Sequence, residues 1–213
     1  MEEPRFWPSK GHYNLDQYYF VSDLLKDKNI QYALETGFCT GRSALSVLHN
    51  SPNLKKMTSI DIDLDYPNIG GRKMSQILSE NFSCFSVIES DSRKQFNTNF
   101  LEENYPDGID YALVDGDHSY GGCMFDLEKI VPHVNKGGLI LIDDYKSGPP
   151  NGCDIPEVTR ACDDFYEKNK DVVSKTEWNK NGKGFCIFTK NWKHYMKRRI
   201  NSVRWKRIMP DLF

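Results

Sequence analysis

Two short apolar segments of this chain end in acidic residues. Tyr111–His118 reads YALVDGDH, and Gly137–Tyr145 reads GGLILIDDY. Short Leu-, Ile- and Val-rich segments bounded by Gly are typical of buried parallel strands, and open α/β sheets bind ligands at the carboxyl ends of such strands. We therefore expect Asp115, Asp143 and Asp144 to meet at one edge of a sheet. Neighbouring carboxylates repel one another unless a cation bridges them, so they predict a site for Mg²⁺ or Ca²⁺, with Mg²⁺ the expected ion.

A histidine lies next to this predicted metal site. His118 comes three residues after Asp115, in the loop that follows the strand. A neutral imidazole in that place could take a proton from a substrate hydroxyl at neutral pH. The alternative is a structural or solvated histidine without a catalytic role.

A glycine-rich segment precedes these residues. Leu34–Ser43 reads LETGFCTGRS and follows a predicted strand; we call it the glycine turn. Gly37 and Gly41 allow a tight strand-to-helix turn and close approach of the backbone to a ligand. Ser43, at the start of the next helix, could hold a carboxylate, and Glu35 could accept hydrogen bonds from an ammonium group. A tight turn without a ligand remains an alternative, and the missing GxGxxG spacing argues against a nicotinamide dinucleotide.

Polar residues also follow the second and third predicted strands. Asp61 is placed to hold the two hydroxyls of a ribose, as acidic residues do in nucleotide-binding α/β folds. Asp91 and Ser92 could face an adenine from the same edge of the sheet. Their alternatives are a solvated acidic loop for Asp61 and a helix N-cap for Asp91 or Ser92.

Alternating strand and helix patterns would position all of these residues. The expected strands are 30–36, 57–62, 85–89, 109–114 and 139–142, followed by a hairpin of 172–178 and 184–189. The expected helices are 15–26, 43–49, 73–80, 92–104, 120–131 and 156–168. Five βα units and a terminal hairpin predict a Rossmann-like, doubly wound, mostly parallel seven-stranded sheet with a C-terminal antiparallel hairpin.

Composition limits the class of protein. The 213 residues suit one domain, and a net charge of −2 argues against a nucleic-acid-binding surface. The six cysteines form no CxxC pair, which favours free thiols in a reducing, cytoplasmic compartment. The first residues have the composition of neither a signal peptide nor a transmembrane segment.

The two ends of the chain differ from its centre. We expect residues 1–190 to form the main domain, with 1–29 as a helical segment that could cover a substrate. Residues 191–213 carry a net charge of +6, against −8 for residues 1–190, and have an amphipathic pattern. This tail could contact an anionic surface, but packing on the body of the domain or across a homo-oligomer seam is the favoured interpretation.

Together these motifs resemble the class I S-adenosylmethionine-dependent O-methyltransferases, in particular the metal-dependent catechol and macrolide-sugar types. The E-x-G-x-x-x-G-x-S pattern of the glycine turn is similar to the methionine-binding turn of that family. Asp61 matches its acidic ribose ligand, and Asp115, Asp143 and Asp144 are similar to its metal triad. His118 stands where the catechol type has a basic lysine.

The resemblance implies transfer of a methyl group from S-adenosylmethionine to a hydroxyl of a small sugar or catechol-like acceptor. Asp115 or His118 would take the hydroxyl proton, and which of them does so stays open. One alternative is a phosphatase that uses the D-x-D sequence at Asp61 and Asp63. Another is a protein that binds the cofactor without catalysis and uses its basic tail as an interaction module.

Overall fold

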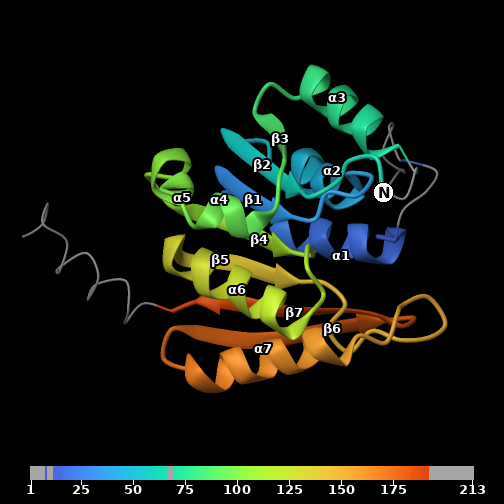
Figure 1. The fold of residues 1–213 in the computed structure, drawn as a ribbon, viewed down its shortest axis with the longest axis vertical. Coiled ribbons are helices and arrows are strands. Elements are labelled where there is room, and N and C mark those ends of the chain that lie inside the picture. The colour runs from blue at the N-terminus through green and yellow to red at the C-terminus, as the bar shows by residue number, and fades with distance from the viewer. Residues whose placement is uncertain (1–7, 9–11, 67–69, 192–213) are drawn as a thin grey trace, which may run out of the picture.

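The computed structural model describes residues 8, 12–66 and 70–191. A seven-stranded sheet forms its centre, with helices on both faces (Figure 1). The strands are β1 Tyr32–Thr36, β2 Lys56–Asp61, β3 Phe85–Glu89, β4 Ile109–Val114, β5 Val134–Ile142, β6 Val173–Lys180 and β7 Lys183–Lys190. The helices are α1 Leu15–Leu25, α2 Arg42–Asn50, α3 Gly71–Asn81, α4 Ser92–Phe96, α5 Phe100–Asn104, α6 Tyr120–Ile130, the 3₁₀ helix η1 Val131–His133 and α7 Pro156–Lys168.

The strand order is β3-β2-β1-β4-β5-β7-β6. Strands β1 to β5 pair in parallel, whereas β7 runs antiparallel to both β5 and β6. This confirms the predicted doubly wound, mostly parallel sheet with its C-terminal antiparallel hairpin. The order reverses between β1 and β4, and open α/β sheets leave a ligand-binding crevice at such a point. The glycine turn follows β1 and Asp115 follows β4, so both lie at this reversal.

The segment after β3 differs from the single helix predicted over residues 92–104. Helix α4 ends at Phe96, and α5 begins at Phe100. Between them, the hydroxyl of Thr98 accepts a hydrogen bond from the backbone N–H of Phe100. Threonine side chains that bond to nearby backbone in this way compete with a continuous helix, which explains the break.

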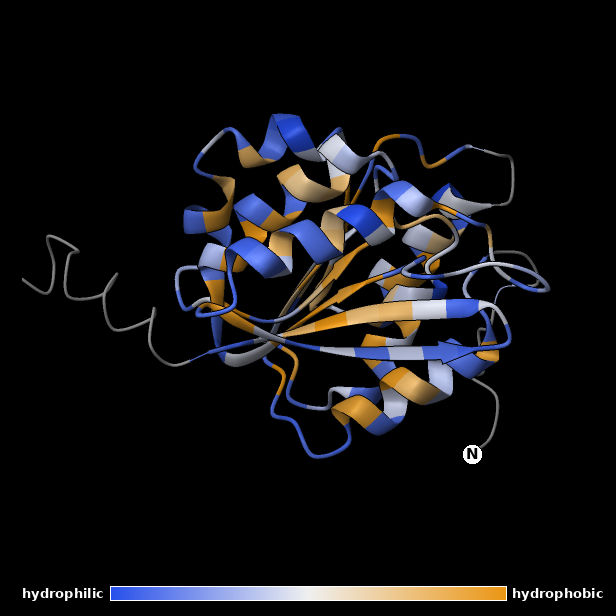
Figure 2. Ribbon diagram, turned by 90° about the horizontal axis from the view of Figure 1, so that it is seen from below, coloured by the Kyte–Doolittle hydropathy of each residue, from blue (hydrophilic) through white to orange (hydrophobic). Residues whose placement is uncertain are grey.

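The strands separate two hydrophobic cores. In β4, Ala112 and Val114 belong to the core on the α6 and α7 side, and Tyr111 and Leu113 to the core on the α1 and α2 side. This alternation follows because successive side chains of a strand point to opposite faces. Figure 2 shows the central strands as a hydrophobic layer between helices whose outer surfaces are hydrophilic.

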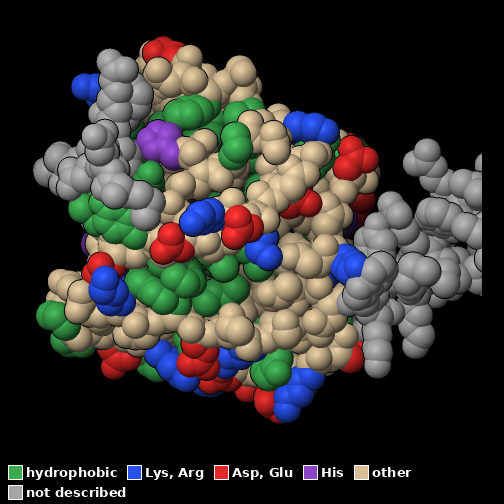
Figure 3. Space-filling view, turned by 180° about the vertical axis from the view of Figure 1, so that it is seen from behind, with side chains coloured by type: hydrophobic (Ala, Val, Ile, Leu, Met, Phe, Trp, Pro, Cys, Tyr) green, Lys and Arg blue, Asp and Glu red, His purple; other side chains and the backbone are tan. Residues whose placement is uncertain are grey.

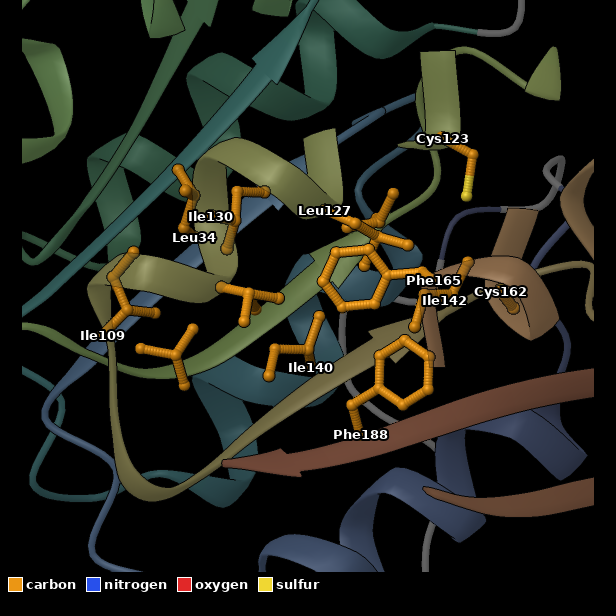
Figure 4. Close-up of a cluster of buried hydrophobic side chains, with 14 of the residues drawn as sticks. Leu34, Ile109, Cys123, Leu127, Ile130, Ile140, Ile142, Cys162, Phe165 and Phe188 are labelled. Atoms are coloured by element: carbon orange, nitrogen blue, oxygen red, sulfur yellow. The ribbon is translucent and has the colours of Figure 1, made fainter. Parts of the chain in front are cut away.

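Helices α6 and α7 cover one face of the sheet through large aliphatic and aromatic side chains. In Figure 4, Leu127 of α6 and Phe165 of α7 approach Ile140 and Ile142 of β5 and Phe188 of β7. All of these side chains are at least 97% buried. This packing holds the carboxyl end of β5, where the acidic pair begins, in a fixed position.

The N-terminal helix packs on the opposite face. Helix α1 begins with a capping box in which Asn14 and Gln17 bond to each other's backbone N–H groups. The guanidinium of Arg42, which lies within the glycine turn, donates hydrogen bonds to the carbonyls of Pro8 and Tyr13. Pro8 and Tyr13 are therefore tied to the glycine turn, while the predicted role of residues 1–29 in covering a substrate stays a prediction.

One face of the molecule carries side chains of mixed type. Figure 3 shows a face on which basic, acidic and hydrophobic side chains are interspersed, without a continuous basic patch. Among the helices of the described part, none is long and apolar enough to cross a membrane. The basic tail after residue 191 lies outside the described residues, so its predicted amphipathic helix stays a prediction.

Candidate functional site

The glycine turn lies directly against the end of β4. Gly37 has a φ of +85°, and a Cβ added there would lie 2.0 Å from the carbonyl oxygen of Asp115. Only glycine combines this backbone conformation with such a close approach. The backbone N–H of Asp115 in turn donates to the carbonyl of Thr36, at 2.9 Å. The sequence-predicted turn and the first predicted metal ligand are therefore immediate neighbours.

Glu35 lies beneath the glycine turn rather than in an open position. Its carboxyl group is fully buried and accepts hydrogen bonds from the hydroxyls of Ser43 and Ser59. Burial raises the pKa of Glu35 to about 8, although the two hydroxyls oppose the shift and the charges of Asp115 and Asp61 add to it. The carboxyl group thus stabilises the turn through its hydrogen bonds to Ser43 and Ser59. The predicted contact between Glu35 and an ammonium group is untested.

Asp61, the last residue of β2, accepts hydrogen bonds from the backbone of the glycine turn. One oxygen, Oδ2, accepts hydrogen bonds from the backbone N–H groups of Phe38 and Cys39, each at 2.8 Å. The other, Oδ1, accepts from the backbone N–H of Asp63 at 3.0 Å. Beside it, Ile62 is 73% exposed, which is unusual for a large apolar residue in this structure. Asp61 and Ile62 are therefore both placed where a bound nucleoside could contact them.

Asp91 and Ser92 take the places that helix capping predicts. Asp91 is the N-cap of α4, and its Oδ1 accepts from the backbone N–H of Arg93 at 2.8 Å. The Ser92 hydroxyl donates to Oδ1 of Asp126 in α6, at 2.9 Å. Burial raises the pKa of Asp126 to about 6. The N-cap alternative for Asp91 is confirmed, while contact of Asp91 or Ser92 with adenine remains a prediction.

Three side chains at the ends of β4 and β5 form a compact group. Ligand atoms of Asp115, His118 and Asp144 all lie within 4.8 Å of one another. His118 Nε2 is 3.2 Å from Asp115 Oδ1, and its Nδ1 is 3.8 Å from Asp144 Oδ2. Asp144 has a φ of +57°, in the left-handed region. Strain of this kind in a non-glycine residue concentrates at functional sites.

Asp143, the remaining predicted metal ligand, lies outside this group of three. Its Oδ1 accepts hydrogen bonds from Nε2 of Gln17 in α1 and from the backbone N–H of Asp144, both at 2.8 Å. Both residues lie in the turn after the end of β5, and the left-handed backbone of Asp144 sends its side chain away from that of Asp143. Burial raises the pKa of Asp143 well above its ordinary value, and the charges of Asp115 and Asp144 add to the shift.

His118 differs from the neutral imidazole that the sequence predicts. Its hydrogen bond to Asp115, together with the charges of Asp144 and Asp143, raises the pKa of His118 to about 9. In this arrangement the imidazole is therefore protonated at neutral pH, and it cannot accept a further proton while it is bonded to Asp115.

A buried lysine that the sequence analysis missed completes the site. Lys183, the first residue of β7, has a side chain only 5% exposed, and its Nζ lies 3.5 Å from Asp144 Oδ1. A lysine beside a hairpin turn is usually solvated, so no sequence signal marks it. Gln17 was also missed, although a polar residue on the apolar face of a predicted helix was a usable signal.

The comparisons with known proteins agree with this geometry. Residues 34–145 match the family described as Methyltransferase domain. The chain belongs to this methyltransferase family. The caffeoyl-CoA O-methyltransferase of Stellaria longipes is 28% identical over 155 residues, which are 73% of this chain and 61% of that protein. This chain therefore matches about three fifths of the length of that relative.

Solved structures of methyltransferases share the fold. The O-methyltransferase of Bacillus cereus, in complex with SAH, has a TM-score of 0.62 at 16% identity and covers 85% of this chain and 84% of its own. The Streptomyces achromogenes O-methyltransferase TomG, in complex with SAM, has a TM-score of 0.65 at 14% identity, with 84% and 82% covered. The predicted resemblance to S-adenosylmethionine-dependent O-methyltransferases is confirmed. A family of this kind argues against the phosphatase alternative for Asp61 and Asp63.

Proposed function

We propose that this methyltransferase moves a methyl group from S-adenosylmethionine to a hydroxyl oxygen of a small acceptor that a divalent cation holds. One observation carries the proposal. The glycine turn lies against the backbone of Asp115, and the side chain of Asp115 belongs to the group of three with His118 and Asp144. A donor bound on the turn and an acceptor bound above Asp144 would therefore be neighbours.

The first three strands would hold the methyl donor. The N–H groups at the start of α2 suit the carboxylate of its methionine part, whereas the Ser43 hydroxyl, which was predicted to hold that carboxylate, already donates to Glu35. Asp61 keeps acceptor capacity for ribose hydroxyls, because each carboxylate oxygen accepts more than one hydrogen bond. Exposed Ile62 would pack against the adenine ring. These roles extend the family resemblance to particular residues of this chain.

The donor set at β4 and β5 fits a divalent cation. Asp115 and Asp144 offer carboxylate oxygens, which suit Mg²⁺ or Mn²⁺, whereas His118 would have to lose its proton before its nitrogen could bind a metal. A second acidic group, Asp63, Asp65 and Glu89, is exposed, and the guanidinium of Arg72 already pairs with Asp65 and Glu89. Asp115 and Asp144 are less exposed, and the cationic groups beside them are His118 and Lys183. A bound cation would lower the pKa of an acceptor hydroxyl.

The residues around the acceptor would orient it and handle its proton. His118 donates to Asp115 while it is protonated, so either the Asp115 carboxylate or a His118 released from that bond would accept the hydroxyl proton. The sulfonium group needs no general acid to leave. Positioning of the attacking oxygen in line with the methyl group therefore accounts for most of the catalysis we expect.

Methyl transfer from labelled S-adenosylmethionine tests the proposal directly. Caffeoyl-CoA, simple catechols and sugars with neighbouring hydroxyls form a suitable acceptor panel, each measured with Mg²⁺ and with excess EDTA. We expect transfer to at least one acceptor that EDTA abolishes, while S-adenosylhomocysteine still binds. Transfer that is indifferent to EDTA would reject the role of the cation. Cofactor binding without transfer to any acceptor would favour the non-catalytic interaction module.

A further inference from the structure

The position of Lys183 is fixed by close backbone packing around it. The backbone N–H of Tyr145 donates to the carbonyl of Gly184, and the N–H of Gly184 donates to the Ser147 hydroxyl. A Cβ added to Gly184 would lie 2.1 Å from the carbonyl oxygen of Tyr145. Strand β7 therefore cannot move away from the segment after β5 without loss of these contacts, and the side chain of Lys183 is held beside Asp144.

The surroundings of Lys183 are acidic. Its ammonium group is 3.5 Å from Asp144 Oδ1, longer than a close charged hydrogen bond. Asp143 and Asp115 also interact with it electrostatically. Three carboxylates thus share two neighbouring cationic groups, Lys183 and the half-exposed His118. Of these two, Lys183 is the one that burial separates from competing water.

We propose that the Lys183 ammonium group is a built-in counter-ion of this site and competes with a divalent cation for Asp144. The inference rests on the proposed function, since it concerns the cation in that proposal. When the cation is absent, Lys183 limits the repulsion between buried carboxylates. When the cation is present, the ammonium charge repels it, because both charges lie in a partly desolvated site where Coulomb interactions are strong. Lys183 thereby weakens cation binding.

Titration of the 213-residue chain with Mn²⁺ alone, measured by calorimetry, tests the inference. Lys183→Met removes the charge at similar length, and Lys183→Arg keeps it. Lys180→Met is the matched control, because Lys180 faces Lys183 across the same hairpin but is exposed and paired with Asp16. We expect Lys183→Met to bind Mn²⁺ at least about tenfold more tightly than the wild type. Lys183→Arg and Lys180→Met should stay within about twofold of it.

Thermal unfolding in excess EDTA is the second measurement. Lys183→Met should unfold at a lower temperature than Lys180→Met, and saturating Mn²⁺ should remove that difference. Lys183→Gln repeats both measurements with a polar, uncharged side chain in case the Met variant does not fold.

The outcomes separate this inference from the proposed function. Equal Mn²⁺ affinity in wild type and Lys183→Met, or unchanged stability of that variant in EDTA, would overturn the role of Lys183 alone. Absence of Mn²⁺ binding in every variant would overturn both the inference and the proposed cation.

Discussion

The two halves of the sheet's carboxyl edge hold their acidic groups in different ways. On the side of β1 and β2, Glu35 and Asp61 are each fixed by hydrogen bonds from hydroxyls or backbone N–H groups. On the side of β4 and β5, Asp115 and Asp144 lie beside two cationic side chains, His118 and Lys183. The first half therefore holds its acidic groups mainly by hydrogen bonds, whereas the second half holds them mainly by neighbouring charges.

The largest effect should come from the second half. We expect Asp144→Asn to lower methyl transfer by about a hundredfold or more, because it removes a ligand of the proposed cation. Affinity for S-adenosylhomocysteine, measured by calorimetry, should stay within about twofold of the wild type. The matched control is Asp23→Asn, an exposed carboxylate of α1, which should change neither quantity. Equal losses of cofactor affinity and activity in Asp144→Asn would show that the two halves are not separable.

The next effect concerns pH and belongs to the first half. Since the pKa of Glu35 is raised to about 8, the folded protein holds this proton where the unfolded chain has lost it. Its contribution to stability is complete below about pH 4.5 and declines as the pH rises through 8, by up to roughly 1.4 kcal/mol per pH unit. Glu35→Gln cannot lose a proton. The stability of this variant relative to wild type should therefore increase between pH 5 and pH 8.

Urea unfolding at the two pH values measures this difference. Comparison of Glu35→Gln with wild type at the same pH cancels the contributions of titrating groups that do not interact with Glu35. A difference that is the same at pH 5 and pH 8 would mean that Glu35 is ionised in the folded protein. The sheet edge beside β1 and β2 would then hold neighbouring ionised carboxylates, as the edge beside β4 and β5 does.

The contact between the two halves can be tested at Gly37. Alanine at this position would combine a positive φ with a Cβ only 2.0 Å from the Asp115 carbonyl oxygen. Gly137→Ala is the control, because Gly137 has a φ of +73° but no atom within 4 Å of the added Cβ. We expect Gly37→Ala to lower the free energy of unfolding by at least about 2 kcal/mol more than Gly137→Ala. Similar losses of unfolding free energy in the two variants would indicate that the glycine turn can move away from Asp115 at little energetic cost.

The smallest effect should arise at the boundary between α1 and the second half. Gln17→Leu removes the hydrogen bond to the buried Asp143 carboxyl group and should cost about 1–3 kcal/mol in chemical denaturation. Gln76→Leu removes an exposed hydrogen bond to Glu80 in α3 and should change stability by less than about 0.5 kcal/mol. If the two substitutions lower the free energy of unfolding by the same amount, the hydrogen bond from Gln17 does not hold Asp143 in place.

Much of the fold could be predicted from local patterns in the sequence. The apolar segments that became β1 and β4 are short and bounded by turn residues, so their type and approximate limits follow from the sequence. Strand β5 begins at Val134, five residues before the strand predicted over 139–142. The helix predicted over 92–104 was wrong because the hydrogen bond of Thr98 is a local event that periodicity does not register. The sequence placed Asp115 and Asp144 at the ends of neighbouring strands but missed Gln17 and Lys183, which come from distant elements. The roles predicted for the site residues stay predictions.

The sequence by itself determined that acidic groups follow β2, β4 and β5 and that a glycine turn follows β1, because strand order along the chain and parallel pairing send these ends to one edge. Only the tertiary structure decided which acidic side chains meet. Asp143 and Asp144 are adjacent in sequence, yet Asp143 contacts Gln17 of α1, whereas Asp144, in a left-handed conformation, lies beside His118 and Lys183. Those partners lie up to 126 residues away, and packing of α1 and β7 on the sheet brings them together.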